Sequence, residues 1–211
     1  MSLFLGRIHY WLYNKINWFE SLELDILAYV TQKGMPGESW SEETYSTYGY
    51  PTGNRPLEEI IDTGNIHGWL QDKIHKAEGR HASLITKILR NDASSIEELK
   101  DVFKKQGQSA ALSLEDKLDS PEDVFNALND FMLEGMPCDR VNEVLSSDKD
   151  QLTWESTVCL HKDHWENAGG DVRNFYILRD EWIRSFVETL GNSLAFERLS
   201  SNTQTIRREA A

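Results

Sequence analysis

The sequence GRIHYWLYNKINWFE at residues 6–20 returns as GNIHGWLQDKIHKAE at residues 64–78, an offset of 67 − 9 = 58 residues. Both stretches carry Gly, Ile, His, Trp, Leu, Lys, Ile and Glu in the same order and at the same spacing. The apolar members recur at steps of three and four residues, which is the spacing of one helix face. The repeat therefore predicts two equivalent long helices, and packing alone explains its Ile, Leu and Trp positions.

The His and Glu of each copy need a further explanation. At 3.6 residues per turn, His9 shares the apolar face of its helix with Glu20, and His67 shares the other with Glu78. Buried polar groups need partners, and within one helix the His and Glu lie roughly 16 Å apart, so each partner must come from another helix. In an antiparallel pair each His meets the Glu of the other copy, whereas in a parallel pair His meets His and Glu meets Glu. We expect the antiparallel pair, because short connections are the commonest.

A transition metal held between these helices is one explanation for the buried polar groups. The spacing Glu78-x-x-His81 resembles half of the ferritin-like di-iron pattern, although no second Glu-x-x-His occurs in the chain. In the segment Cys159-Leu-His161-Lys-Asp-His164, two imidazoles lie one helical turn apart. Imidazoles with a carboxylate suit Zn, Fe or Ni better than Mg or Ca. The candidate metal ligands are His9, His67, His161, His164, Glu20, Glu78 and His81. The alternative is that buried His–Glu hydrogen bonds fix helix register without a metal.

The remaining pattern predicts an all-α bundle of six to seven helices. Helices are expected over residues 3–33, 56–90 with a break at 63–65, 94–106, 120–134, 139–145, 150–167 and 171–190. Residues 37–55 are expected to form a long loop with one short helical turn. No segment shows sustained alternation of β-branched residues, so no strand is expected. We predict a single domain at residues 1–198 and a frayed polar tail at residues 199–211.

Charge and composition narrow the class of partner. The 211 residues carry 22 Lys and Arg against 35 Asp and Glu, for a net charge of −13. Nucleic acid and anionic membranes bind through clustered basic residues, so neither is an expected partner. The two cysteines, Cys138 and Cys159, are too few for a disulfide scaffold and fit a reducing compartment, and no apolar stretch is long enough to span a membrane. The expected location is the cytoplasm.

Two kinds of function fit these observations. The leading hypothesis is a metal-binding bundle that acts as a metal or redox sensor, or as a metal-dependent hydrolase or oxidase. The alternative is a non-catalytic acidic interaction protein, a chaperone or regulator that binds a peptide, a protein or a second copy of itself. Burial of Trp40, Tyr45, Tyr48 and Tyr50 distinguishes them, because an exposed aromatic patch favours binding and a lid over a polar pocket favours an enzyme or sensor. The chain lacks phosphate-binding glycine loops and a Gly-x-Ser-x-Gly elbow, which argues against nucleotide-driven chemistry and α/β-hydrolases.

Overall fold

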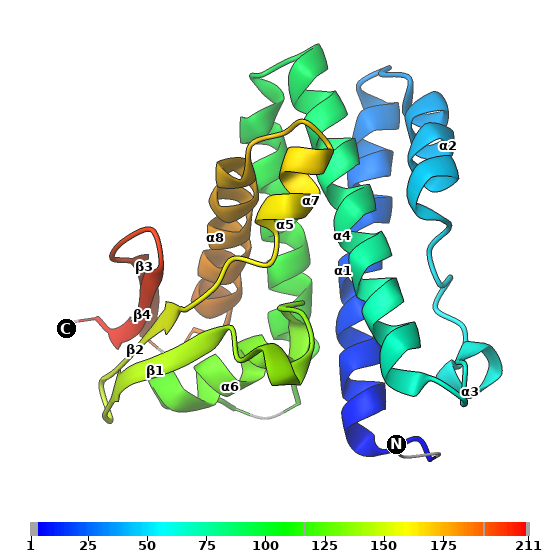
Figure 1. Cartoon of the computed structure of the whole chain (residues 1–211). Coiled ribbons are helices and arrows are strands. Elements are labelled where there is room, and N and C mark those ends of the chain that lie inside the picture. Colours follow the sequence, from blue (N-terminus) through cyan, green and yellow to red (C-terminus); the bar gives the residue numbers. More distant parts are fainter. Residues whose placement is uncertain (1–3, 116, 192, 210–211) are drawn as a thin grey trace.

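The computed structural model describes residues 4–115, 117–191 and 193–209, and it combines a helical bundle with a small sheet (Figure 1). The helices are α1 (Arg7–Gln32), α2 (Gly37–Tyr48), α3 (Leu57–Ile60), α4 (Ile66–Asn91), α5 (Ser95–Leu112), α6 (Pro121–Phe131), α7 (Lys162–Asn167), α8 (Val172–Thr189) and the 3-10 turn η1 (Pro137–Asp139). The strands are β1 (Asn142–Ser147), β2 (Gln151–Ser156), β3 (Leu194–Arg198) and β4 (Thr203–Arg208).

The all-α prediction is wrong, because these strands form a four-stranded antiparallel sheet in the order β1-β2-β4-β3. Residues expected to be helical at 139–145 and 150–156 lie mainly in η1, β1 and β2, and β4 occupies residues 203–208 of the tail that was expected to be frayed. The sheet packs on α6, where the rings of Phe125 and Trp154 lie 5.0 Å apart. Burial of the β2 and β4 side chains against the helices stabilises strands whose own sequences are short and polar.

Helices α1 and α4 pack in parallel, so the expectation of an antiparallel pair is also wrong. Both helices begin at the same end of the molecule in Figure 1, and His9 contacts His67 across the pair. The chain returns between them through α2, which replaces most of the loop expected at residues 37–55. At 1.5 Å per residue, the 12 residues of α2 span about 18 Å of the about 39 Å length of α1, and the segment that follows α2 covers the rest of the return.

Of two glycines at predicted helix ends, Gly34 ends its helix and Gly107 does not. Gly34 follows α1 with a φ of +67°, so it ends the helix in the left-handed conformation as expected. Gly107 was expected to end a helix, but α5 continues through it. A Cβ at Gly107 would lie 2.4 Å from the backbone oxygen of Trp182, so this glycine permits the close approach of α5 and α8.

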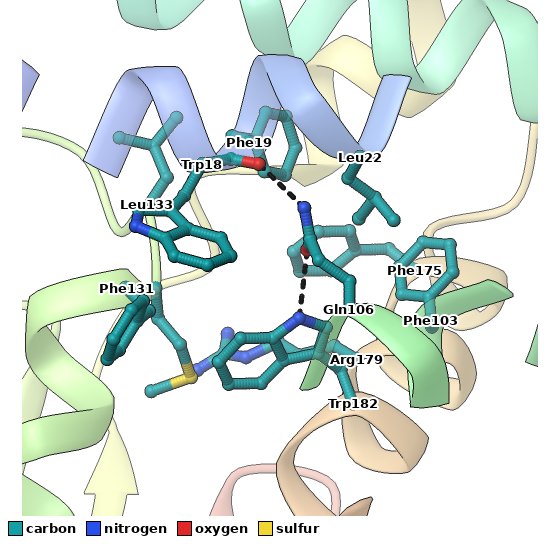
Figure 2. A pocket seen from close by; sticks show the side chains of 11 residues that line it. Trp18, Phe19, Leu22, Phe103, Gln106, Phe131, Leu133, Phe175, Arg179 and Trp182 are labelled. Carbon is teal, nitrogen blue, oxygen red and sulfur yellow. Dashed lines mark hydrogen bonds between the residues drawn. The ribbon is translucent and has the colours of Figure 1, made fainter. Parts of the chain in front are cut away.

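The core has one large cluster, which joins the sheet to most of the helices, and a smaller one between α3 and the first halves of α1 and α4. Within the large cluster, aromatic side chains from α1, α5 and α8 enclose a cavity (Figure 2). In the described residues, no helix combines the length and apolarity needed to cross a membrane.

Candidate functional site

The seven side chains proposed as metal ligands do not form one group. His9 and His67 meet at the beginning of α1 and α4. Glu20 belongs to a separate ion-pair network, in which it pairs with Arg80 of α4. Four others lie at the middle of α4 and at α7: Glu78, His81, His161 and His164.

The rings of His9 and His67 contact each other, and His9 has a second partner in the backbone of Gly6. Their Nε2 atoms are 3.3 Å apart, and the backbone N–H of Gly6 donates to His9 Nδ1 at 2.9 Å. An Nδ1 that accepts a hydrogen bond leaves the proton of neutral His9 on Nε2, which then donates to His67. A metal on His9 Nε2 would require that nitrogen to lose its proton. The proton of the neutral ring would then lie on Nδ1, which could no longer accept the hydrogen bond from Gly6. Burial, and then the charge of His67, lower the pKa of His9, which favours the neutral form of His9.

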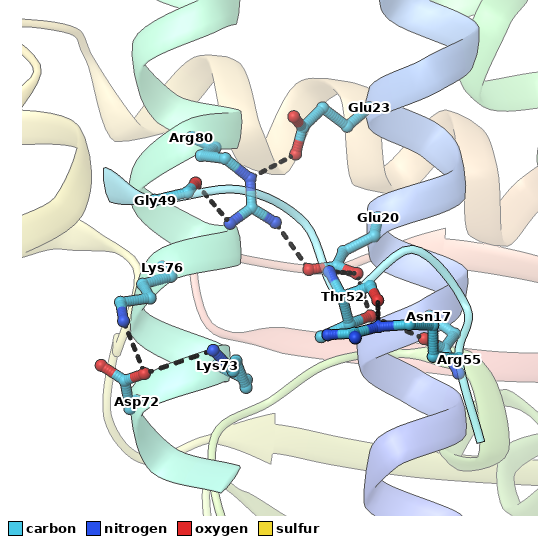
Figure 3. A network of polar contacts seen from close by, with 10 residues as sticks. All are labelled: Asn17, Glu20, Glu23, Gly49, Thr52, Arg55, Asp72, Lys73, Lys76 and Arg80. Carbon is cyan, nitrogen blue, oxygen red and sulfur yellow. Dashed lines mark hydrogen bonds and ion pairs between the residues drawn. The ribbon is translucent and has the colours of Figure 1, made fainter. Parts of the chain in front are cut away.

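Glu20 is held in a network that fastens α2 and the following loop to α1 and α4 (Figure 3). Arg80 donates to Glu20 Oε1 at 2.7 Å, to Glu23 Oε2 at 2.8 Å and to the backbone oxygen of Gly49. The second oxygen of Glu20 accepts from the backbone N–H and the hydroxyl of Thr52. Both oxygens of the Glu20 carboxylate therefore have hydrogen-bond donors from the protein.

A chain of buried charged side chains crosses the centre of the molecule. His161 Nδ1 lies 3.0 Å from Glu78 Oε1, and its Nε2 lies 3.4 Å from Glu134 Oε2. The other oxygen of Glu134 pairs with Arg179. All four side chains are less than 10% exposed. The chain thus runs Glu78–His161–Glu134–Arg179 and links α4 and α7 to α8 through the loop after α6.

The charge states along this chain follow from its neighbours. Burial opposes the protonated form of His161, but the carboxylates of Glu78 and Glu134 outweigh it and raise the pKa of His161 to about 10. Burial also opposes ionisation of Glu134, but Arg179 and His161 outweigh it and lower the pKa of Glu134 to about 2. At neutral pH the chain therefore contains a charged imidazolium between two carboxylates.

One end of this chain opens into a cleft of about 570 Å³. Glu78 lines the cleft, and its Oε2 is buried without a hydrogen-bond partner among the described residues. The imidazoles of His75 and His164 also line it, with ring centroids 5.5 Å apart. Cys159 lies at the same cleft, where its sulfur accepts a hydrogen bond from the Tyr176 hydroxyl at 3.0 Å. As the side chains stand in the described part of the chain, no three His, Cys, Asp or Glu residues converge on one metal position.

His81, the seventh candidate, lies outside the cleft. Its ring stacks on Phe19 at 4.5 Å and meets Phe103 and Phe175 edge-on, and neither ring nitrogen has a hydrogen-bond partner in the described residues. Burial lowers the pKa of His81 to about 4, so this imidazole is neutral. Glu78 and His81 lie one turn apart on α4, but Glu78 lines the cleft whereas His81 packs among aromatic rings.

Sequence reasoning missed His75, Glu134 and Arg179. Arg179 carries a detectable signal, because it falls on the apolar stripe of α8 between Phe175 and Trp182. His75 is exposed, and it lines the cleft. Comparison of the chain with protein-family models, with curated proteins and with solved structures finds no match, so the cleft is interpreted from its own residues.

Proposed function

We propose that the chain binds a transition-metal ion in the cleft through His75, Glu78 and His164. The observation that carries the proposal is the buried Glu78 Oε2, which has no hydrogen-bond partner and shares the cleft with two imidazoles. A buried carboxylate oxygen without a partner is costly, so a cation or a donor from the cleft is expected to satisfy it. Two histidines and one carboxylate are the donor set of many catalytic zinc sites and of non-haem iron sites.

We expect side-chain rotation to bring the three proposed donors together. His75 is exposed and contacts only the Gln71 amide and the ring of His164 among the described residues, and His164 is half-buried. His75 and Glu78 lie one turn apart on α4, so both reach the same side of that helix. His161 holds the other oxygen of Glu78, as outer-shell partners do for metal ligands.

Three protein donors would leave a coordination position for water or a substrate, which is typical of catalytic rather than structural zinc sites. A bound metal would lower the pKa of such a water and supply a nucleophile for hydrolysis. Cys159 is a fourth donor at the cleft and would make the site sensitive to thiol oxidation. These features support a metal-dependent hydrolase or a metal and redox sensor, with Zn, Fe or Ni as the ion.

The test is titration of the metal-free full chain with Zn²⁺ by calorimetry and with Co²⁺ by visible absorption. We expect one ion per chain, and an affinity at least about 100-fold lower for the double variant His75→Ala, His164→Ala. The matched control is His9→Ala, His67→Ala, which removes the same number of histidines and keeps the affinity. Glu78→Gln is expected to weaken binding while far-UV circular dichroism remains native. Equal affinity in all variants, or no uptake by the wild type, would overturn the proposal.

The competing interaction-protein hypothesis receives less support. Trp40, Tyr45 and Tyr48 lie on α2 and are half-buried against the bundle, and of these four aromatics only Tyr50 is exposed. The segment therefore offers neither a lid over the cleft nor a broad aromatic patch. Partner binding, whether to a peptide or a second copy, stays a prediction. Both thiols are free and exposed, so the cytoplasm remains the proposed location.

A further inference from the structure

A second opening lies on the solvent side of α1, and we call it the α1 groove. One wall is a stripe of α1 that includes Asn14, Asn17 and Trp18, and the other is the loop at residues 50–54. Its volume is about 720 Å³, and small-molecule sites commonly measure about 300–1,000 Å³. The α1 groove and the cleft share no lining residue in the described part of the chain.

Buried hydrogen bonds hold the loop wall of the α1 groove in place (Figure 3). The Arg80 network binds the backbone oxygen of Gly49, directly before the loop. In the middle of the loop, the backbone N–H and the hydroxyl of Thr52 donate to the buried Glu20 carboxylate. Directly after it, the Tyr13 hydroxyl donates to the backbone oxygen of Arg55 at 2.7 Å. The loop is therefore fixed before a ligand arrives, which lowers the entropy cost of binding.

Between these anchors the loop presents two side chains that the protein does not hold by hydrogen bonds. Gly53 and Asn54 have φ values of +71° and +53°, so the chain makes a tight turn there in a conformation that asparagine tolerates well. Tyr50 is 74% exposed, and its ring lies 5.2 Å from that of Tyr45. An exposed aromatic ring and an amide thus stand on a fixed loop, where they can meet a ligand.

The α1 wall repeats this combination of an aromatic ring with amides. Asn14 and Trp18 lie four residues apart, as do Asn17 and Ser21, so these side chains share one side of the helix. Trp18 is half-buried and Asn14 is exposed. Asn17 Oδ1 accepts from the Thr52 hydroxyl at 3.1 Å, which leaves the two Nδ2 hydrogens of Asn17 as donors.

The α1 groove presents no free charge, although the chain carries a net charge of −13. Among the described residues that line it, Glu20 is the one charged side chain, and both of its oxygens accept hydrogen bonds from Arg80 or Thr52. A charged ligand would find no opposite charge there, and a wholly apolar ligand would cover the amides without bonding them. The lining fits a neutral ligand with many hydroxyl groups and one apolar face, because the hydroxyls pair with amides and the apolar face packs on aromatic rings.

We infer that the α1 groove binds a neutral saccharide of one or two pyranose rings. Its ring faces pack on Tyr50 and Trp18, and its hydroxyls pair with the amides of Asn14, Asn17 and Asn54. A β-linked glucose unit has equatorial hydroxyls and C–H groups on both faces, so it presents the required apolar face. The inference concerns a second site and does not depend on metal binding in the cleft.

Titration of the full chain with cellobiose, followed by tryptophan fluorescence and by calorimetry, tests this assignment. We expect saturable binding with a Kd of about 1 mM or below. Added salt should leave the Kd unchanged, because neither the saccharide nor the groove contributes a free charge. Sorbitol has the hydroxyls without the ring faces and is expected not to saturate the site. A proline-rich decapeptide without net charge, the probe for a peptide groove, is expected not to bind.

Variants at exposed positions locate the site without disturbing the core. Tyr50→Ala is expected to weaken cellobiose binding at least about tenfold, whereas Tyr50→Phe keeps the ring and most of the affinity. Asn54→Gly keeps the left-handed turn, removes the amide and is expected to weaken binding at least about threefold. The matched control is Tyr10→Ala, which removes an exposed aromatic of α1 outside the groove and keeps the affinity.

Far-UV circular dichroism of each variant confirms that it is folded. Absence of saturable cellobiose binding to the wild type would overturn the inference, and so would an affinity that Tyr50→Ala leaves unchanged. Saturable binding of the decapeptide in place of the saccharide would also overturn it and would identify the α1 groove as a peptide site.

Discussion

Glu20 and Glu78 occupy the same position in the two copies of the repeat, yet their carboxylates have different surroundings. Both oxygens of Glu20 are bound, one by Arg80 and the other by Thr52. Glu78 shares one oxygen with His161 and leaves the other without a partner at the cleft. The first carboxylate is a structural connector, and the second is available to a ligand.

The difference comes from what packs beside each copy. The first copy is covered by α2 and the loop that follows, which supply Thr52 and place Gly49 near Arg80. The second copy is covered by the short helix α7 and the loops around it, which leave an opening. The duplicated helix thus supplies a polar position twice, and its neighbours determine whether that position is saturated.

Arg80→Met would break the saturated side of this comparison and give the largest effect. It leaves Glu20 and Glu23 buried without their cation, and we expect a loss of about 3–5 kcal/mol in the free energy of unfolding. Chemical denaturation measures it. The triple variant with Glu20→Gln and Glu23→Gln should recover much of the loss, because no buried charge remains. A loss of less than about 1 kcal/mol would show that the network contributes little.

Lys15 and Lys73 are another equivalent pair of the repeat, and their ammonium groups lie over Trp11 and Trp69. The variant Lys15→Met tests how the two differ. Burial lowers the pKa of Lys15 from 10.5 to about 8, so the unfolded chain binds more protons between these values and wild-type stability rises with pH there. At 1.36 kcal/mol per unit, the rise amounts to about 3 kcal/mol. We expect Lys15→Met to lose this rise and to be more stable than the wild type at pH 7.

Denaturation curves across that pH window provide the measurement, with Lys73→Met as the matched control. The Lys73 side chain is 21% exposed, and Lys73→Met keeps Lys15 in place, so this variant should keep the rise in stability with pH. The same pH profile in Lys15→Met and the wild type would rule out a strongly perturbed Lys15.

His67→Ala would give the smallest effect, because it removes one hydrogen bond at a partly exposed site. We expect a loss of about 0.5–1 kcal/mol above pH 6.5. The pKa of His9 is lowered in the folded state, so the contribution of this hydrogen bond should disappear as the pH falls below 6.5 and His9 becomes protonated. A double-mutant cycle between His9→Ala and His67→Ala measures the coupling. Coupling that persists in acid would contradict a hydrogen bond that depends on neutral His9.

The sequence predicted the two long helices and their core-facing polar residues, but it did not predict the sheet. Strand β2 buries Leu152, Thr153 and Trp154 in succession, and β4 buries three consecutive residues in the same way. Alternation of polar and apolar residues is expected only where one face of a strand is exposed, so neither strand has the alternating pattern that predicts a strand. Strand β1 is almost wholly exposed and carries no apolar stripe.

The site was predictable only in part, because some of its residue types stand out in a sequence and others do not. Glu78, His161 and His164 were identified because histidines and repeated glutamates stand out in a sequence. Arg80 and Arg179 were not, although each interrupts an apolar helix face, because most arginines of a chain are solvated and the sequence does not show which one is buried. The partner of Glu20 was not predicted correctly, because that partner depends on the parallel direction of α4. The path of the chain through α2 determines this direction.

The parallel packing of α1 and α4 also has a consequence for folding kinetics. Equivalent residues of the two helices, such as His9 and His67, are 58 residues apart in sequence, and α2 with α3 must be placed before the pair can close. Contacts of such separation are slow to form, because the entropy of closing the loop is lost before the contact is gained. Docking of α4 on α1 is therefore expected late in folding, after the local contacts of the β1–β2 and β3–β4 hairpins have begun to form.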